Sequence, residues 1–306
     1  MRLVSFFNQT NKTIRPGLVE QEVVIDIQQA KKLLQLTVPD SIQEIIEHYT
    51  TAHKDLQLIA ETARQGRLNE ASYTLKDVSL AAPIPHPRKN IMCLAVNYTE
   101  HAKETAALRE HGGKAPTQPV MFTKAPTSVN GPYGNIVINP AVSQQIDWEV
   151  ELGVIIGKKG INIREDEAMS YVFGYTVLND VTARDLQSRH KQFFKGKSLD
   201  GSCPMGPWIV TADEISDPHN LALRLRVNGE IKQDGNTRQM IFSIPDMIAT
   251  LSLGMTLEPG DIIATGTPSG VGFSRVPPEF LQPGDIMESE VEGIGTLRNP
   301  IVSSQQ

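Results

Sequence analysis

An apolar run that carries two glutamates constrains this chain more than any other segment. Residues 147–157 read Asp-Trp-Glu-Val-Glu-Leu-Gly-Val-Ile-Ile-Gly, and their Val and Ile content is typical of a buried strand. Side chains two apart on a strand share a face, so Glu149 and Glu151 project together. Buried carboxylates need a counter-charge, and a divalent cation supplies one. The segment therefore predicts a metal enzyme built on a strand.

A third carboxylate, Asp180, ends a second apolar run that begins at Tyr171. Oxygen ligands without an accompanying His or Cys suit a hard cation, Mg²⁺ or Mn²⁺, with Ca²⁺ as an alternative, and make zinc less favoured. The spacing alone also fits a solvated strand face or partners for Arg and Lys. The metal site is therefore a hypothesis at this point.

Length and charge limit the class of protein. The 306 residues suffice for one large domain with an accessory, or for two domains. Lys and Arg total 29 against 35 Asp and Glu, without a basic block, so we expect no nucleic-acid partner. Cys93 and Cys203 form no CxxC pattern, which indicates free thiols and a cytoplasmic protein. No signal-like or membrane-spanning apolar stretch is present, so we expect no membrane partner.

The first part of the chain predicts a small α+β domain over residues 1–82. Short strands are expected at 3–7 and 22–27, followed by one helix over 42–65, where apolar residues recur near helical spacing. The proline-rich segment 81–87 cannot sustain a helix or a central strand and indicates a boundary.

Residues 83–306 are richer in strands and glycine turns and predict a second, catalytic domain. Asn228-Gly229 indicates a hairpin turn. A final strand pair is expected around residues 283–285, and a helix over 247–253. The fold class is therefore α+β and strand-rich.

Further polar residues suggest chemistry near the carboxylates. The helix-like stretch from Asp180 places Arg184 and Gln187 on the same face, where they could flank a metal and hold a substrate carboxylate; an ordinary surface arginine is equally compatible. Gly196-Lys197-Ser198 resembles a P-loop ending, but the earlier glycine of that motif is missing. Lys197 could instead neutralise an enolate beside the metal, or lie in a surface loop.

A histidine and a turn complete the candidate residues. His101 and Glu104 lie three apart near a helix start, a spacing that lets a carboxylate orient an imidazole base, although most histidines are not catalytic. Thr267, in the tight loop 266–270, could bind a carboxylate, although glycine-rich turns are usually only turns.

Taken in order, these segments resemble the fumarylacetoacetate hydrolase family over about residues 83–300. The segments that carry the resemblance are residues 97–104, 147–157, 179–187, 196–200, 203–207 and 266–270. The resemblance implies a mixed β-roll catalytic domain that forms homodimers. With its N-terminal unit, the chain is similar to bacterial members of the same length.

The resemblance also implies roles for the candidate residues. The metal ligands would be Glu149, Glu151 and Asp180, holding Mg²⁺ or Mn²⁺. The catalytic residues would be His101 and Glu104, on a lid that closes over the site, and Lys197, which would contact a small 2-oxo acid. The lid segment 105–117 is expected to order only when ligand binds. The substrate pocket would be lined by Arg184, Gln187 and Thr267. Ala95 stands where the family often has glycine, which affects only the expected lid hinge.

The implied reaction is cleavage of a C–C bond in a 2-oxo acid. Decarboxylation of oxaloacetate to pyruvate and CO2 is the first expectation, with acylpyruvate hydrolysis close behind. An alternative is isomerisation or decarboxylation of 2-hydroxyhepta-2,4-diene-1,7-dioate in aromatic catabolism. A non-catalytic, metal-stabilised binding protein is the alternative from another class. The ligand set does not select among these reactions.

Overall fold

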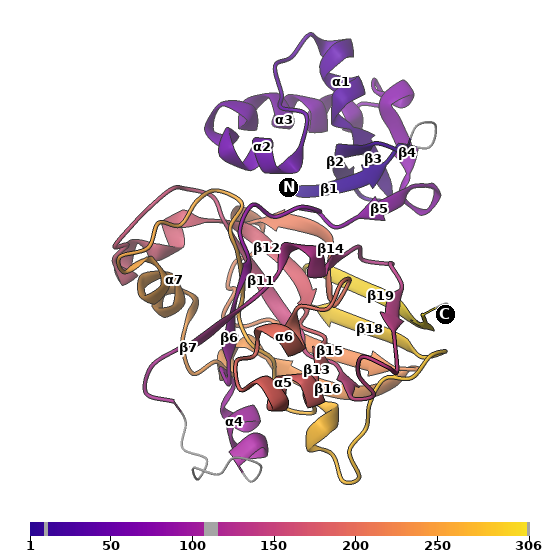
Figure 1. Cartoon of the computed structure of the whole chain (residues 1–306). Coiled ribbons are helices and arrows are strands. Elements are labelled where there is room, and N and C mark those ends of the chain that lie inside the picture. Colours follow the sequence, from indigo (N-terminus) through magenta and orange to yellow (C-terminus); the bar gives the residue numbers. More distant parts are fainter. Residues whose placement is uncertain (9–11, 107–115, 305–306) are drawn as a thin grey trace.

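The computed structural model describes residues 1–8, 12–106 and 116–304, and it confirms a strand-rich α+β protein (Figure 1). Most of the predicted lid over 105–117 lies outside the described residues. The helices are α1 (Ile27–Leu34), α2 (Ile42–Glu47), α3 (Tyr49–Arg64), α4 (Thr99–Ala106), α5 (Arg184–His190), α6 (Phe194–Lys197) and α7 (Ile244–Ser252). None of the helices in the described part has the length and hydrophobicity that a bilayer span requires.

The described strands form one long sheet, a second sheet and a short pair. The long sheet runs in the spatial order β4 (Ser72–Thr74), β3 (Val23–Asp26), β2 (Ile14–Glu20), β1 (Arg2–Phe7), β14 (Cys203–Thr211), β12 (Val172–Asn179), β11 (Val150–Ile156), β17 (Ile262–Ala264), β6 (Ile91–Ala95) and β7 (Val120–Lys124), with β5 (Ser79–Ala81) on β1 and β8 (Val129–Asn130) on β14. The second sheet has the order β16 (Glu230–Asn236), β15 (Ala222–Val227), β18 (Ile286–Val291), β19 (Gly295–Ser303) and β9 (Ile136–Ile138), and β10 (Ile146–Asp147) pairs with β13 (Thr182–Ala183).

The antiparallel pair β11–β12 forms the buried centre of the long sheet. Every residue of both strands is buried, as their Val- and Ile-rich sequences predicted. The register places Val150 opposite Asn179. Glu149, just before β11, and Asp180, just after β12, therefore meet at the same end of the pair, where the Asp180 amide donates to the Glu149 carbonyl oxygen at 2.9 Å.

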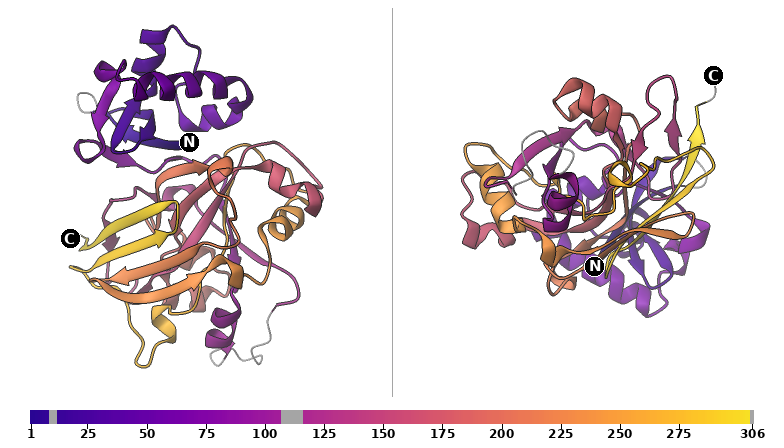
Figure 2. Two further views of the ribbon diagram at one scale, coloured as in Figure 1. Left: turned by 180° about the vertical axis from the view of Figure 1, so that it is seen from behind. Right: turned by 90° about the horizontal axis from the view of Figure 1, so that it is seen from below.

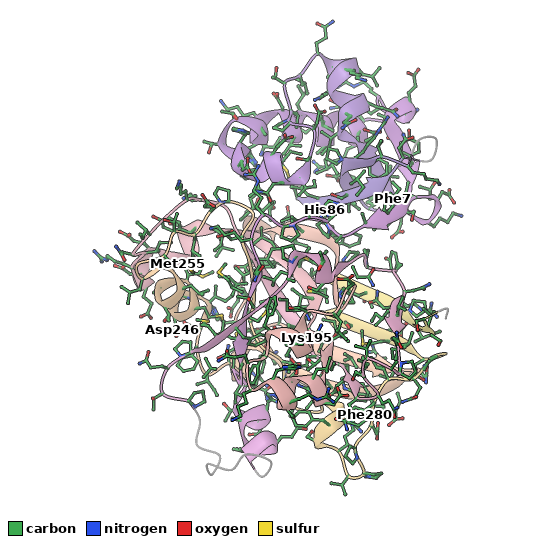
Figure 3. All side chains as sticks on the ribbon, in the orientation of Figure 1. Phe7, His86, Lys195, Asp246, Met255 and Phe280 are labelled. Carbon is green, nitrogen blue, oxygen red and sulfur yellow. The ribbon has the colours of Figure 1, made fainter. Side chains whose placement is uncertain are left out.

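The N-terminal segment packs its helices on strands β1–β4, above the rest of the molecule in Figure 1 and in the reverse view of Figure 2. Because β1 also pairs with β14, the long sheet continues from this segment into the remainder. Phe7 and His86 lie at the level where the two parts meet (Figure 3). The division of the chain at residue 82 stays a prediction.

The single helix predicted over residues 42–65 is wrong, because α2 and α3 are separate helices that meet at His48. On one straight helix, at 100° per residue, the apolar faces of the two segments would point roughly 60° apart. These faces are formed by Ile42, Ile45 and Ile46 in α2 and by Ala52, Leu56 and Ile59 in α3. A change of direction lets both apolar faces pack on the N-terminal sheet.

The second sheet confirms one predicted turn and corrects another. Asn228 and Gly229 join β15 to β16 with φ of 53° and 81°, the left-handed pair that a two-residue hairpin needs. The final strand pair does not surround residues 283–285, which precede β18. It turns instead at residues 292–294, where Gly293 has φ 73°. Pro283 and Gly284 indicated a turn at the first segment, whereas the second segment carries only Gly293, so composition favoured the wrong one.

Candidate metal and oxo-acid site

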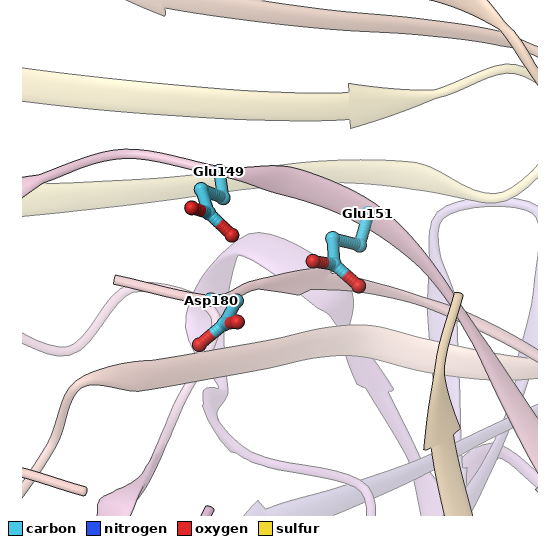
Figure 4. Close-up of side chains that lie close together, drawn as sticks. All are labelled: Glu149, Glu151 and Asp180. Atoms are coloured by element: carbon cyan, nitrogen blue, oxygen red, sulfur yellow. The ribbon is translucent and has the colours of Figure 1, made fainter. Parts of the chain in front are cut away.

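Glu149, Glu151 and Asp180 come together inside the protein. One ligand atom from each lies within 4.8 Å of those of the other two, and all three side chains are buried. Figure 4 shows both glutamates descending from the same stretch of chain toward Asp180. Side chains alternate between the two faces of an extended segment, and the two glutamates therefore share a face, as the sequence predicted.

Asp180 does not lie on the helix predicted to begin there. Thr182 and Ala183 form strand β13 against β10, and α5 begins only at Arg184. Pairing with β10 satisfies backbone groups that a helix from Asp180 would have used internally. Arg184 and Gln187 nevertheless share a helix face, and Arg184 Nη1 donates to Gln187 Oε1 at 3.2 Å.

Three buried cations surround the carboxylates. Lys197 Nζ donates to Glu149 Oε2 at 2.8 Å and to Asp180 Oδ2 at 2.6 Å. Lys124 Nζ lies 2.8 Å from Asp180 Oδ1. Arg184 Nη2 lies 2.7 Å from Glu149 Oε1. Glu149 and Asp180 are therefore each neutralised by two cationic groups.

Asp147 holds Arg184 in this arrangement. Its Oδ2 accepts from Arg184 Nε at 2.8 Å, and its carboxylate also accepts from the backbone amides of Gly272 and Phe273. The Arg184 guanidinium lies over the Phe273 ring, with its carbon Cζ 4.2 Å from the ring centroid. Arg184 is thus fixed by protein groups on several sides, and its predicted contact with a substrate carboxylate stays a prediction.

The buried charges leave Glu151 without a cationic partner. Four carboxylates (Asp147, Glu149, Glu151, Asp180) face three cations (Lys124, Arg184, Lys197), and among the described residues Glu151 forms no ion pair. Burial, together with the charges of Asp180 and Glu149, raises the pKa of Glu151 well above its ordinary value. Although burial alone raises the pKa of Glu149, the charges of Lys197 and Arg184 lower it to about 2.

These residues fit a divalent cation. The donor set is oxygen-only, and one buried carboxylate has no counter-charge from the protein. A 2+ charge would turn the balance of four anions and three cations into a net charge of +1, which suits an anionic ligand. Glu149, Glu151 and Asp180 are therefore the groups that could hold Mg²⁺ or Mn²⁺.

His101 and Glu104 form a hydrogen-bonded pair on α4, as their spacing predicted. His101 Nδ1 and Glu104 Oε2 are 3.1 Å apart, and Glu104 Oε1 accepts from the Gly270 amide at 2.9 Å. Burial favours the neutral acid, but hydrogen bonds, above all that with His101, lower the pKa of Glu104 below its ordinary value. The carboxylate is thus ionised and anchored, and it orients the imidazole.

A cavity of about 500 Å³ lies beside this cluster. Its lining includes Glu149 and every predicted substrate and catalytic residue except Glu104, namely His101, Arg184, Gln187, Lys197 and Thr267. The Thr267 hydroxyl donates to the Val150 carbonyl oxygen at 2.9 Å and accepts from Gln233 Nε2 at 2.8 Å. A substrate donor can therefore reach only the remaining lone pair of that oxygen.

Sequence reasoning missed Lys124 and Asp147. Lys124 is 0% exposed, at the end of β7, and no pattern distinguishes it from a surface lysine. Besides Asp180 it contacts the carbonyl oxygen of Lys197, so it links a carboxylate to the backbone that carries the second lysine. Asp147 did leave a signal, because it extends the two-residue spacing of Glu149 and Glu151 by one step.

Close packing of α6 on α5 sets the position of Lys197. A Cβ on Gly196 would lie 2.6 Å from the Gln187 amide nitrogen and 2.8 Å from the Ala183 carbonyl oxygen. We expect Gly196→Ala to lower the free energy of unfolding by about 1–3 kcal/mol through overpacking, and to reduce activity by moving Lys197. Denaturant unfolding checks this, with Gly131→Ala, whose nearest contact would be 3.4 Å, as the control. Equal stability of the two variants would contradict it.

Comparison with known proteins identifies the family. The family model described as fumarylacetoacetate (FAA) hydrolase, C-terminal, matches residues 90–302. The chain is 48% identical to oxaloacetate tautomerase YisK of Bacillus subtilis over 289 residues, which covers 93% of this chain and 94% of that protein. It is 41% identical to the mitochondrial oxaloacetate tautomerase fahd2 of Xenopus laevis, covering 99% of this chain and 90% of that protein.

Solved structures agree with this likeness. A fumarylacetoacetate hydrolase from Exiguobacterium antarcticum superposes with a TM-score of 0.80 at 38% identity, covering 99% of this chain and 100% of that one. Maleylpyruvate hydrolase from Sphingobium, solved with manganese(II) and pyruvate, gives a TM-score of 0.77 at 33% identity over 100% of both chains. The chain therefore belongs to the fumarylacetoacetate hydrolase family of enzymes.

Proposed function

We propose that the protein is a divalent-metal-dependent enzyme that interconverts the enol and keto forms of oxaloacetate. The observation that carries this proposal is the convergence of an oriented imidazole, His101, and a buried ammonium, Lys197, on one cavity beside three carboxylates. Two relatives named oxaloacetate tautomerases match nearly the whole chain, which supports this substrate.

We assign the proton transfer to His101. Glu104 holds Nδ1, so we assign the transfer to Nε2. The imidazole takes a proton from C3 of the keto acid, the C–H electron pair becomes the C2–C3 double bond, and the 2-oxygen receives a proton to give the enol. No atom is gained or lost, and the reverse sequence restores the keto acid.

To Lys197 we assign stabilisation of the charge that develops on the 2-oxygen. An ammonium has three N–H donors, and two of them are used by Glu149 and Asp180, which leaves one for a substrate oxygen. A donor fixed in a buried site in advance of the reaction lowers the barrier more than a mobile one. A cation held by the three carboxylates would add Lewis-acid polarisation of the 2-oxo group.

Oxaloacetate decarboxylation, the first expectation from the sequence, stays a prediction for the same site. It would pass through the enolate of pyruvate, whose charge develops on the same 2-oxygen. Acylpyruvate hydrolysis and isomerisation of 2-hydroxyhepta-2,4-diene-1,7-dioate stay alternatives. A homodimer and a cytoplasmic location stay predictions. The ultraviolet absorbance of the enol and the release of pyruvate, followed in one reaction, separate tautomerisation from decarboxylation.

His101→Asn is expected to lower the catalysed tautomerisation rate by about 10²–10⁴-fold, the range for removal of a general acid–base. The asparagine amide can still donate to Glu104, so the fold is expected to remain. His190→Asn, on an exposed helix end, is the matched control and should keep full activity. Full activity of His101→Asn would show that another group moves the proton. Absence of tautomerisation in the wild-type enzyme with Mn²⁺ or Mg²⁺ would reject the proposed function.

A further inference from the structure

Lys191 lines the same cavity as the candidate site, at its exposed edge. It follows α5, which carries Arg184 and Gln187, and precedes α6, which carries Lys197. Its side chain is exposed, whereas Lys197 is only 2% exposed. The cavity is therefore lined by one buried and one exposed ammonium group.

The two lysines and the arginine of the cavity differ in what already binds them. Arg184 pairs with Asp147 and Glu149, and Lys197 pairs with Glu149 and Asp180. Lys191 forms no ion pair within the described part of the chain. Of these three cations, Lys191 thus keeps its full charge for a ligand.

The segment around Lys191 is locally basic in an acidic protein. Residues 186–199 contain four Lys or Arg and no Asp or Glu, while the whole chain carries a net charge of −6. A cluster of one sign at the edge of a cleft attracts ligands of the opposite sign. The edge of this cavity therefore favours an anionic group on the ligand.

The backbone at Lys191 has a conformation that non-glycine residues rarely adopt. Lys191 has φ 57° and ψ −40°, and the Gln192 amide donates to the His190 carbonyl oxygen at 2.6 Å. This is a γ-turn with positive φ, a rare and strained form. Strained residues of this kind concentrate at functional sites, where the surrounding structure maintains them. The turn joins α5 to α6 and so fixes Lys191 relative to Arg184 and Lys197.

We propose that Lys191 is a specificity-determining residue that binds the second carboxylate of a 2-oxo dicarboxylic acid. This inference rests on the proposed function. The 2-oxo acid end would lie near Lys197 and the buried carboxylates, and the far carboxylate would reach the exposed edge of the cavity. Lys191 then selects dicarboxylates over 2-oxo acids that end in a methyl group, because those leave its charge without a partner.

The test compares two ligands that differ only at the far end of the molecule. Oxaloacetate ends in a carboxylate, and 2-oxobutanoate has the same number of carbons but ends in a methyl group. Isothermal titration of each, freshly dissolved, into Mn²⁺-loaded protein gives the dissociation constants. Lys191→Gln is expected to weaken oxaloacetate binding about tenfold, as expected for loss of a charge-assisted contact, and to leave 2-oxobutanoate binding unchanged.

Two variants control this experiment. Lys195→Gln removes the same charge from an exposed residue of the same segment that does not line the cavity, and it should alter neither constant. Figure 3 labels Lys195 in the lower part of the molecule. Lys191→Arg retains the charge and should keep most of the preference for oxaloacetate. The two glutamine variants thus separate a specific contact from general loss of positive charge.

The possible outcomes separate this inference from the proposed function. The assignment of Lys191 would be overturned if Lys191→Gln weakened the binding of both ligands equally, or if Lys195→Gln weakened oxaloacetate binding as much as Lys191→Gln does. Either result would count even if the wild type tautomerises oxaloacetate. A wild type that binds oxaloacetate no better than 2-oxobutanoate would overturn it too. If Lys191→Gln selectively weakens the binding of oxaloacetate but the wild type shows no tautomerase activity, the role of Lys191 is supported and the proposed reaction is rejected.

Discussion

Glu151→Gln is expected to abolish stabilisation by Mn²⁺ while leaving the metal-free protein at least as stable as the wild type. Glu151 is buried, and among the described residues it has no cationic partner. Burying this carboxyl group without a counter-charge is costly whether it stays ionised or takes up a proton, so its replacement relieves a desolvation cost. Glutamine retains an oxygen that can accept from the Gly266 amide, which donates to Glu151 at 2.7 Å. The substitution therefore removes a ligand charge and keeps the local hydrogen bond.

The expected magnitudes make this test decisive. At a Mn²⁺ concentration of 100 times the dissociation constant, the wild type should gain about 2.7 kcal/mol in its free energy of unfolding, and Glu151→Gln close to none. Tautomerase activity should fall by about 100-fold or more, since Lewis-acid stabilisation contributes several kcal/mol. Thermal unfolding with and without Mn²⁺ measures the first effect. Glu165→Gln, which removes an exposed carboxylate, is the control. Unchanged Mn²⁺ stabilisation in Glu151→Gln would mean that the ion binds elsewhere.

Lys197→Met is expected to destabilise the metal-free protein by roughly 3–5 kcal/mol, the cost of removing one partner from a buried ion pair. Lys197 is 2% exposed and donates to both Glu149 and Asp180. Methionine nearly fills the same volume, so the loss is chiefly one of charge. The two carboxylates that remain would repel each other and would attract a cation more strongly.

Mn²⁺ should therefore restore the stability of Lys197→Met without restoring its activity. The activity is expected to stay about 10²–10³-fold below wild type, as for loss of a donor to a developing oxyanion. Unfolding curves at several Mn²⁺ concentrations, together with the rate of enol decay, measure both effects. Lys195→Met controls for charge at the surface. Recovery of activity along with stability would show that Lys197 serves only to neutralise Glu149 and Asp180.

Local pattern predicted the parts of the site that follow a strict geometric rule. The pleat of a strand puts residues two apart on one face, so the pairing of Glu149 and Glu151 follows from their spacing alone. A helix places residues three apart on neighbouring positions, which gave the contact between His101 and Glu104. Asn228-Gly229 specified its turn because both residues tolerate positive φ.

Local pattern failed where packing or pairing with distant segments decides the outcome. The break at His48 depends on the surface that α2 and α3 cover, and that surface comes from strands elsewhere in the chain. Asp180 leads into a strand because β10 offers hydrogen-bond partners to β13. The ion pair of Lys124 with Asp180 joins residues that are far apart in sequence, so no spacing could reveal it.

The sequence by itself determined the family, the strand-rich fold class and the shared face of two glutamates, because these depend on ordered motifs and on local periodicity. Only the tertiary structure decided the balance of charge around them. Lys124, Arg184 and Lys197 reach the carboxylates from separate elements, and they neutralise every buried carboxylate of the site, Asp147 included, except that of Glu151. Long-range electrostatics of this kind follows from which segments pack together, and a linear pattern does not encode those distances.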